Sequence, residues 1–253
     1  MPSRNVVGAL AIMVSLAAGA AIASEHAPHW TYQGETGPTH WSSMAPEFGA
    51  CSTGHAQSPI DIHAGTSDSG ELPDIQFAYH PAPLRLIDNG HTVQVDYAPG
   101  SFIEVGGHRY QLVQFHFHKP SEESIDGKHY AMVAHLVHKD SDGRLAVVAV
   151  PLAPGAANPM VATLWKNLPA RKEAEVEPKG VQIDASDLLP ADHDYYTYMG
   201  SLTTPPCSEG VTWFVLKNPS TLSASEIGRF AAVYPMNARP VQPLNGRVVQ
   251  ASD

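Results

Sequence analysis

Apolar and polar side chains alternate with a period of two through the middle of the chain. In residues 92–97 every second side chain is apolar, and residues 111–118 follow the same period. Because successive side chains of a strand project to opposite faces, this alternation predicts strands that bury one face. Further strands are expected between turn signals such as Asp142-Gly143, at 131–138, 145–152 and 211–216. The chain is therefore predicted to be mostly β.

Helices are expected to be few and short. One is predicted at 160–168 and another at 224–232, where Ser223 and Glu226 have the spacing of a capping box. The sequence contains no visible long repeat and no change of composition that marks an internal boundary. We therefore predict one domain over residues 24–253, preceded by a leader.

The first residues predict a cleaved export signal. Arg4 gives a positively charged start, and an apolar run from Val6 to Ala23 ends in small residues. We assign residues 1–23 to a signal peptide and place the mature protein in the periplasm or outside the cell. The other interpretation is a membrane anchor, which needs about 20 apolar residues, so this run is at the short limit. No stable anchor is expected after cleavage.

Export to an oxidising compartment would allow the two cysteines to form a disulfide. Cys51 and Cys207 are the only cysteines of the sequence. A lone pair in an exported protein is most simply one disulfide. Two cysteines alone cannot supply a zinc-binding set.

The charge balance argues against several classes of partner. The chain has 15 Lys and Arg against 25 Asp and Glu, a formal net charge of −10. Nucleic acid and anionic membrane surfaces repel such a chain, so neither is an expected partner. We expect a small-molecule substrate, and the sequence leaves open whether the protein forms a homodimer.

Two histidines share one face of the strand expected at 111–118. The period divides this strand into a face with Val113, Phe115 and Phe117 and a face with Leu112, Gln114, His116 and His118. Adjacent imidazoles on a sheet face are typical of a metal site. A chance pair on a polar face gives the same pattern, so a third ligand is needed.

The strand at 131–138 offers that third imidazole. His135 and His138 are three residues apart and project from opposite faces. His135 shares its face with Val133 and Val137, whereas His138 is followed by a turn and is expected at the rim. We therefore choose His135. Three neutral imidazoles with one open position are the arrangement of a catalytic zinc site.

Four segments together resemble the alpha class of carbonic anhydrases, specifically its exported bacterial type. They are QFHFHKPSEES at 114–124, AHLVHKD at 134–140, GSLTTPPCSEGVTW at 200–213 and NARPVQPLNGR at 237–247. The resemblance extends from about residue 29, through QSPIDI at 57–62, to Arg247. It implies a large, mainly antiparallel twisted sheet of about ten strands with a few short peripheral helices. It also implies reversible hydration of carbon dioxide to bicarbonate and a proton, by hydroxide bound to Zn²⁺.

The resemblance implies roles for matching positions. His91 matches the proton shuttle, a task suited to an imidazole because it titrates near neutral pH. Thr203 and Glu122 match the pair that orients the hydroxide, and Gln114 matches the residue that supports His116. The other matches hold the waters of the proton relay (Tyr32, Asn89 and Gln94) or line the carbon dioxide pocket (Val137, Val147, Leu202, Thr204, Val211 and Trp213).

One position departs from the family pattern. The acidic residue usual two positions before the third ligand, where it supports that ligand, is replaced by Val133. Glu123 or a backbone carbonyl is a candidate substitute, and the sequence does not choose between them.

The competing interpretation is a non-catalytic zinc-binding or surface-binding protein on the same scaffold, because a fold does not by itself imply a function. Loss of a ligand histidine is the usual signature of such a protein, and all three histidines are present here.

Overall fold

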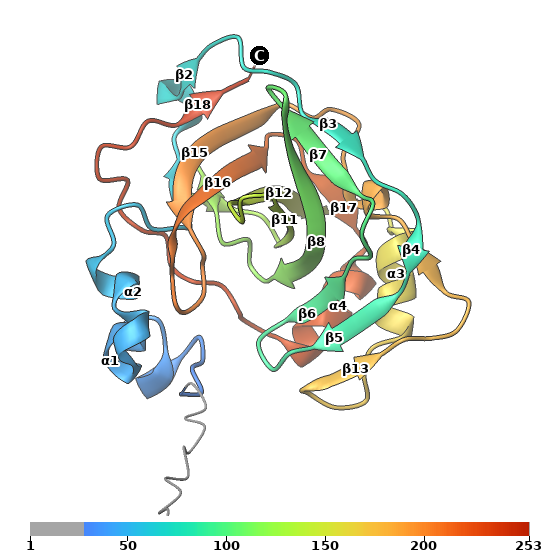
Figure 1. Ribbon diagram of the computed structural model, residues 1–253. Coiled ribbons are helices and arrows are strands. Elements are labelled where there is room, and N and C mark those ends of the chain that lie inside the picture. Colours follow the sequence, from blue (N-terminus) through green and yellow to red (C-terminus); the bar gives the residue numbers. More distant parts are fainter. Residues whose placement is uncertain (1–27, 253) are drawn as a thin grey trace, which may run out of the picture.

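A twisted sheet forms the centre of the computed structural model, which describes residues 28–252 (Figure 1). Ten of its strands follow one another across the sheet: β13 (Ala174–Val176), β5 (Arg85–Asp88), β6 (Val93–Asp96), β8 (His108–His118), β11 (Met132–Lys139), β12 (Leu145–Pro154), β16 (Glu209–Leu216), β15 (Tyr195–Ser201), β18 (Gln250–Ala251) and β2 (Asp68–Ser69). Three more attach beside this path: β3 (Gln76–Ala78), β7 (Phe102–Val105) and β17 (Ser220–Leu222).

Most neighbouring strands of this sheet are antiparallel. Within this sheet, as far as the structure describes it, the parallel pairs are β12 with β16, β12 with β17, and β18 with β2. The long pairings of β11 with β8 and β12, and of β15 with β16, are antiparallel. The predicted mainly antiparallel sheet of about ten strands is therefore confirmed.

In the described part of the chain, two small sheets and four short 3₁₀ turns lie outside the large sheet. The small sheets consist of β1 (Asp61–Ile62), β9 (Ser124–Ile125) and β10 (Lys128–His129), and of β4 (Ala82–Pro83) and β14 (Gln182–Ile183). The 3₁₀ turns are η1 (Gly34–Thr36), η2 (Pro46–Phe48), η3 (Ala64–Thr66) and η4 (Ala185–Leu188). The predicted leader at 1–23 lies outside the described residues. Among residues 28–252, no helix has the length and apolar character needed to cross a membrane.

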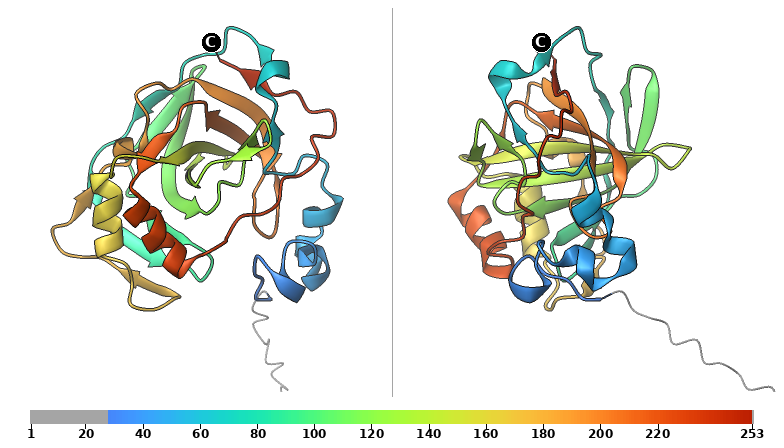
Figure 2. Two further views of the ribbon diagram at one scale, coloured as in Figure 1. Left: turned by 180° about the vertical axis from the view of Figure 1, so that it is seen from behind. Right: turned by 90° about the vertical axis from the view of Figure 1, so that its left-hand side faces the viewer.

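The helices are short and lie at the periphery of the sheet (Figure 2): α1 (Trp41–Met44), α2 (Ala50–Thr53), α3 (Pro159–Lys166) and α4 (Ala224–Val233). The predicted capping box begins α4. The Glu226 amide donates to Ser223 Oγ at 3.2 Å, and the Ser223 amide donates to Glu226 Oε2 at 2.7 Å. The helix predicted at 160–168 is α3, whose N-cap side chain Asn158 accepts from two backbone amides.

The sheet separates two buried regions. In the main core, Phe117 of β8 packs against Trp165 of α3 and Phe230 of α4, with ring centroids 5.2 Å and 6.2 Å away. A second apolar cluster surrounds Trp213 of β16. His135 contacts the Trp213 ring edge-on at 4.9 Å between centroids, so this second region lies beside the histidines.

Leu112 of β8 lies on the face opposite to the predicted one. The period of two places it beside the histidines, but it is fully buried in the main core, and Val113 is exposed. The cause is a register shift, because β11 pairs Val137 with Gln114 and its next residue with Leu112. Val113 is the extra residue of this bulge, and a bulge resets the alternation of side chains.

His138 lies in the main core, so the expectation that it lies at the rim is wrong. Its side chain is fully buried, and Nε2 is 2.8 Å from the Tyr79 hydroxyl. A turn follows β11, but Tyr79, from a distant segment, covers this end of the strand. Burial lowers the pKa of His138 to about 3, so the ring is neutral in the folded protein at neutral pH.

This buried histidine predicts a loss of stability in acid. Below its ordinary pKa of about 6.5, His138 binds a proton in the unfolded chain but not in the folded one, so the free energy of unfolding falls as pH decreases from about 6.5 towards 3. His138→Phe should reduce that pH slope by about 1.4 kcal/mol per pH unit. Urea unfolding between pH 5 and pH 7 measures it, with the exposed His63→Ala as the control. An unchanged slope in His138→Phe would contradict the assignment.

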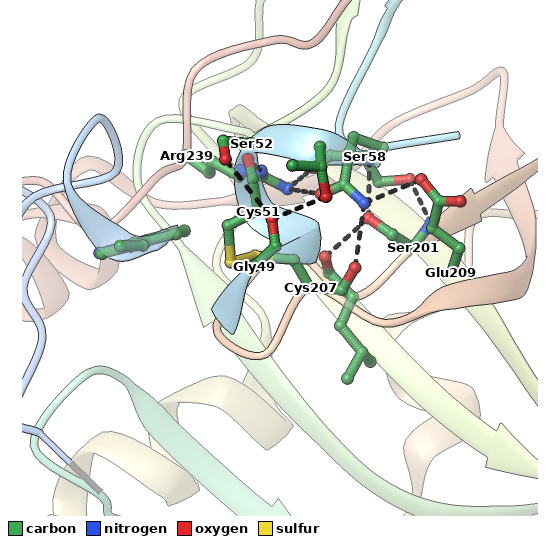
Figure 3. Close-up of a disulfide and its surroundings, with 12 residues drawn as sticks. Gly49, Cys51, Ser52, Ser58, Ser201, Cys207, Glu209 and Arg239 are labelled. Carbon is green, nitrogen blue, oxygen red and sulfur yellow. Dashed lines mark hydrogen bonds between the residues drawn. A yellow bond between two sulfur atoms is a disulfide. The ribbon is translucent and has the colours of Figure 1, made fainter. Parts of the chain in front are cut away.

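The predicted disulfide joins Cys51 of α2 to Cys207, 156 residues later (Figure 3). The two cysteines pack with Trp41 and Phe48 in a small apolar cluster. Gln57 Nε2 donates to the Cys207 carbonyl at 3.0 Å, a second link between the same two segments. The N-terminal arm is therefore tied to the loop at 202–208.

Loss of this disulfide should lower the thermal stability of the protein. Closing a loop of 156 residues contributes at most about 4 to 5 kcal/mol by restricting the unfolded chain. A variant with both Cys51→Ser and Cys207→Ser should therefore melt at a markedly lower temperature than the oxidised protein. It should melt at the same temperature as the wild type treated with a reductant. Titration of two reactive thiols in the native wild type would overturn this prediction.

Candidate metal centre

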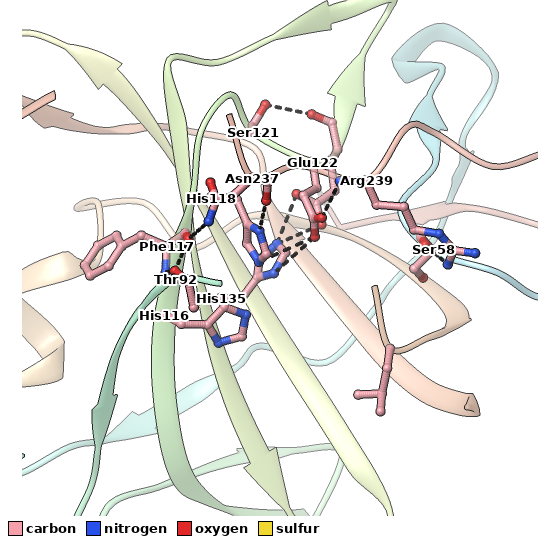
Figure 4. Close-up of polar contacts among 12 residues, drawn as sticks. Ser58, Thr92, His116, Phe117, His118, Ser121, Glu122, His135, Asn237 and Arg239 are labelled. Atoms are coloured by element: carbon pink, nitrogen blue, oxygen red, sulfur yellow. Dashed lines mark hydrogen bonds and ion pairs between the residues drawn. The ribbon is translucent and has the colours of Figure 1, made fainter. Parts of the chain in front are cut away.

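Adjacent strands bring three histidines together. The antiparallel pairing of β8 with β11 places His116 directly opposite His135, and His118 opposite Val133. One ring nitrogen from each of His116, His118 and His135 lies within 4.8 Å of the other two (Figure 4). The predicted three-histidine set is therefore present as one cluster.

The second nitrogen of each ring donates a hydrogen bond to a neighbouring oxygen. His116 Nδ1 donates to Gln114 Oε1 at 2.8 Å, and His118 Nδ1 donates to the Asn237 carbonyl at 2.7 Å. His135 Nε2 donates to Glu123 Oε1 at 3.0 Å. These contacts fix each ring orientation and leave Nε2 of His116, Nε2 of His118 and Nδ1 of His135 as the nitrogens that face the cluster centre.

Two of these inward nitrogens show that the cluster fits a metal ion. His118 Nε2 and His135 Nδ1 are buried and have no hydrogen-bond partner among the described residues. An unpaired buried polar atom is costly, and an ion shared by three imidazoles removes that cost. Three imidazole nitrogens, each with an outer hydrogen bond on the other ring atom, suit a tetrahedral Zn²⁺ with one open position.

Burial also favours the neutral imidazoles that bind metal. It lowers the pKa of His116 to about 3 and lowers the pKa of His118 as well. Burial acts on His135 in the same direction, but the charge and hydrogen bond of Glu123 outweigh it and raise the pKa of His135. Glu123 is the charged member of the three supporting groups.

Glu122 lies beside two of the clustered histidines, His118 and His135. Its Oε1 accepts from the Arg239 amide at 2.7 Å, and its Oε2 is 3.5 Å from His118 Nε2. Burial raises the pKa of Glu122 to about 7, while His135, the Arg239 amide and the Thr203 hydroxyl act in the opposite direction. The Thr203 hydroxyl is therefore near enough to act on the pKa of Glu122, and Glu122 Oε2 is buried without a hydrogen-bond partner among the described residues.

Most of the predicted pocket wall belongs to the apolar cluster around Trp213. Val147 and Val211 are buried in it, and Val137 and Leu202 pack against it partly buried. The indole of Trp213 is held by a hydrogen bond from Nε1 to the Ser201 carbonyl at 3.1 Å. Thr204, the sixth predicted wall residue, is partly buried in the loop that also carries Thr203.

His91 follows the turn between β5 and β6. Its ring stacks on Trp30, with centroids 3.7 Å apart and planes 5° from parallel. Burial, and then the neighbouring His29, lower the pKa of His91, so the ring is neutral at neutral pH and is able to accept a proton.

The predicted relay residues lie on neighbouring elements. Asn89 Nδ2 donates to Gln94 Oε1 at 3.2 Å, and Gln94 is paired with His116 across β6 and β8. Tyr32 contacts the Trp30 ring, with centroids 5.3 Å apart. Burial and then the Glu122 charge raise the pKa of Tyr32, so its hydroxyl keeps its proton.

Sequence reasoning missed three residues that hold this centre together. Asn237 supports His118, Arg239 supports Glu122, and Trp30 stacks on His91. The segment NAR at 237–239 was visible in the sequence, but nothing in its residue types indicates contact with a strand about 120 residues away.

Comparisons with known proteins find carbonic anhydrases by sequence and by structure. The family described as eukaryotic-type carbonic anhydrase matches residues 36–253. The carbonic anhydrase of Klebsiella pneumoniae is 47% identical over 227 residues, 88% of this chain and 91% of the relative. That of Nostoc sp. is 44% identical over 226 residues, 87% of this chain and 85% of the relative. The solved alpha-carbonic anhydrase of Thermovibrio ammonificans, complexed with the inhibitor sulfanilamide, is similar at a TM-score of 0.84 and 41% identity, covering 88% of this chain and 98% of that one.

Proposed function

We propose that this chain, which belongs to the alpha-class carbonic anhydrases, catalyses the reversible hydration of carbon dioxide to bicarbonate and a proton. The observation that carries the proposal is the cluster of three imidazoles with nitrogens within 4.8 Å of one another, beside an apolar wall. His116, His118 and His135 would hold Zn²⁺, which when bound would supply hydroxide at neutral pH, because in carbonic anhydrases the ion lowers the pKa of water to about 7.

The apolar wall suits a small neutral substrate. Val147, Val211 and Trp213 are buried in the apolar cluster beside His135, and their side chains have no free hydrogen-bonding group, because the indole N–H is already bonded to Ser201. Carbon dioxide has no charge and no hydrogen to donate, so it loses little when it leaves water for such a surface. Val137, Leu202 and Thr204 complete the proposed wall.

Thr203 and Glu122 orient the nucleophile. The Glu122 carboxylate accepts from the Arg239 amide at 2.7 Å on Oε1, and its buried Oε2, which has no hydrogen-bond partner among the described residues, is the acceptor we assign to the Thr203 hydroxyl. A hydroxyl that donates to a carboxylate has only lone pairs to offer elsewhere. Thr203 therefore accepts the nucleophile's proton in a hydrogen bond and turns a lone pair of the nucleophile towards the substrate.

His91 moves the released proton to the solvent. Its amide donates to Asn89 Oδ1 at 3.0 Å, and Asn89 in turn donates to Gln94; these two residues and Tyr32 are assigned to the waters that connect His91 to the histidines. A neutral imidazole takes a proton from the site and passes it to buffer. Gln114, through its bond to His116, keeps the ligand ring in place.

The proposed mature protein is an exported domain of residues 24–253, with residues 1–23 as its signal peptide. The disulfide between Cys51 and Cys207 supports this placement, because such bonds form and persist in the periplasm and outside the cell.

Stopped-flow carbon dioxide hydration with metal analysis tests the proposal. The active protein should contain one zinc per chain, should lose hydration on chelation, and should regain it with Zn²⁺. An active preparation without a divalent metal would refute the mechanism. A zinc-loaded protein without hydration would instead favour the non-catalytic zinc-binding or surface-binding protein.

Two variants separate proton transfer from attack. His91→Ala should lower kcat on the order of 10- to 100-fold and leave kcat/KM nearly intact, because His91 acts after bicarbonate release. Thr203→Ala should lower both parameters, kcat/KM by about 100-fold, because its interaction belongs to the transition state. Imidazole buffer should restore activity to His91→Ala and not to Thr203→Ala. If kcat/KM falls as far as kcat in His91→Ala, with no response to buffer, His91 is not the shuttle.

A further inference from the structure

The contact between His135 and Glu123 departs from the family pattern described above. His135 Nε2 lies 3.0 Å from Glu123 Oε1 and 3.3 Å from Glu123 Oε2, and the Glu123 residue is only 3% exposed. Val133, two residues before His135 on the same face of β11, has no acceptor for this ring. The His135 ring is therefore supported by a residue from outside its own strand.

We propose that Glu123 is the positioning residue of the third metal ligand, supplied by the loop between β8 and β9. The proposal rests on the function proposed above and deepens it. In this proposal the Glu123 carboxylate strengthens zinc binding by the chain. Glu123 follows Glu122 directly in the sequence, and the resemblance to the family implies no role for its position.

The chemistry of the three supporting groups makes Glu123 the strongest of them. Gln114 and the Asn237 carbonyl are neutral acceptors for His116 and His118. Glu123 is a buried carboxylate, and hydrogen bonds to an ionised acceptor are about twice as strong as neutral ones. It holds the proton of His135 on Nε2, which leaves Nδ1 as a lone pair directed at the cluster centre, and it raises the basicity of that lone pair.

The loop itself is held by hydrogen bonds on both sides of Glu123. Ser121 Oγ donates to the Glu123 carbonyl at 2.8 Å, and the Ser121 amide donates to the Tyr130 carbonyl at 3.1 Å. Ser124 Oγ donates to Asp61 Oδ1 at 2.6 Å. These bonds fix the backbone from which the carboxylate reaches His135, so the orientation of this ligand depends on the loop and not on β11 alone.

Zinc affinity measures the proposed role without reference to catalysis. The metal-free wild type and Glu123→Gln would be titrated with Zn²⁺ in competition with a chelator of known affinity. Glu123→Gln keeps the shape of the side chain and removes its charge, and it should bind Zn²⁺ about 10- to 100-fold more weakly. The rise in melting temperature on zinc loading should shrink accordingly.

Glu226→Gln is the matched control. Glu226 is also a buried carboxylate, but it caps α4, and in residues 28–252 its hydrogen bonds go to Asn158, Trp165 and Ser223 and to none of the three histidines. Its replacement should lower the melting temperature of the metal-free protein and leave the zinc affinity unchanged. A loss of affinity equal to that of Glu123→Gln would assign the effect to general destabilisation and overturn the proposal.

A measurement on the zinc-loaded wild type covers the case in which Glu123→Gln does not fold. Nitrogen-15 NMR of the histidine rings should find the His135 proton on Nε2, in slow exchange with water because it is buried and bonded to Glu123. A rapidly exchanging His135 ring proton would overturn the proposal. If the wild type binds no Zn²⁺, the proposed function fails; if it binds Zn²⁺ with an affinity that Glu123→Gln does not change, only this inference fails.

Discussion

The segment from Asn237 to Arg239 supplies hydrogen bonds to buried groups from several distant parts of the chain. Asn237 accepts from His118 through its carbonyl and from the Lys119 amide through its side chain, and it donates to the carbonyls of His91 and Phe117. The Arg239 amide donates to Glu122. Each of these polar groups raises the free energy of the folded protein if it is buried without a partner. The hydrogen bonds from this segment offset that cost for the groups around the histidine cluster.

The same arginine connects the centre to the N-terminal arm. Its buried guanidinium donates to the carbonyls of Cys51 and Ser58 and to Gln57 Oε1. The disulfide between Cys51 and Cys207 continues this connection into the loop that carries Thr203. Glu122 and Thr203 come from separate loops, and their relative position is therefore set by one buried cation and one covalent bond. This arrangement explains how residues far apart in the sequence keep a fixed relative geometry, which the electrostatic role proposed for them requires.

The predicted strands and the predicted cluster of three histidines were mostly correct because they follow from local periodicity. The alternation in 111–118 puts His116 and His118 on one face, and the pattern around His135 selects the histidine that joins them. Local periodicity failed at Leu112, where a bulge changes the face, and at His138, which is covered by Tyr79. Both errors have the same origin, since neither a bulge nor a covering residue from another segment leaves a mark on the strand it affects.

By itself, the sequence determined the class of fold, the three imidazoles, the single cysteine pair and the resemblance to a family, because each depends on residue type and spacing. Only the tertiary structure decided which atoms support those imidazoles. Val133 left the third ligand without its usual acid, and the sequence offered both Glu123 and a backbone carbonyl as substitutes. The choice falls on Glu123 because the fold of the loop between β8 and β9 places its carboxylate 3.0 Å from His135 Nε2. A hydrogen bond depends on distance and direction in space, and residues 12 apart in the chain acquire these only when strand pairing is complete.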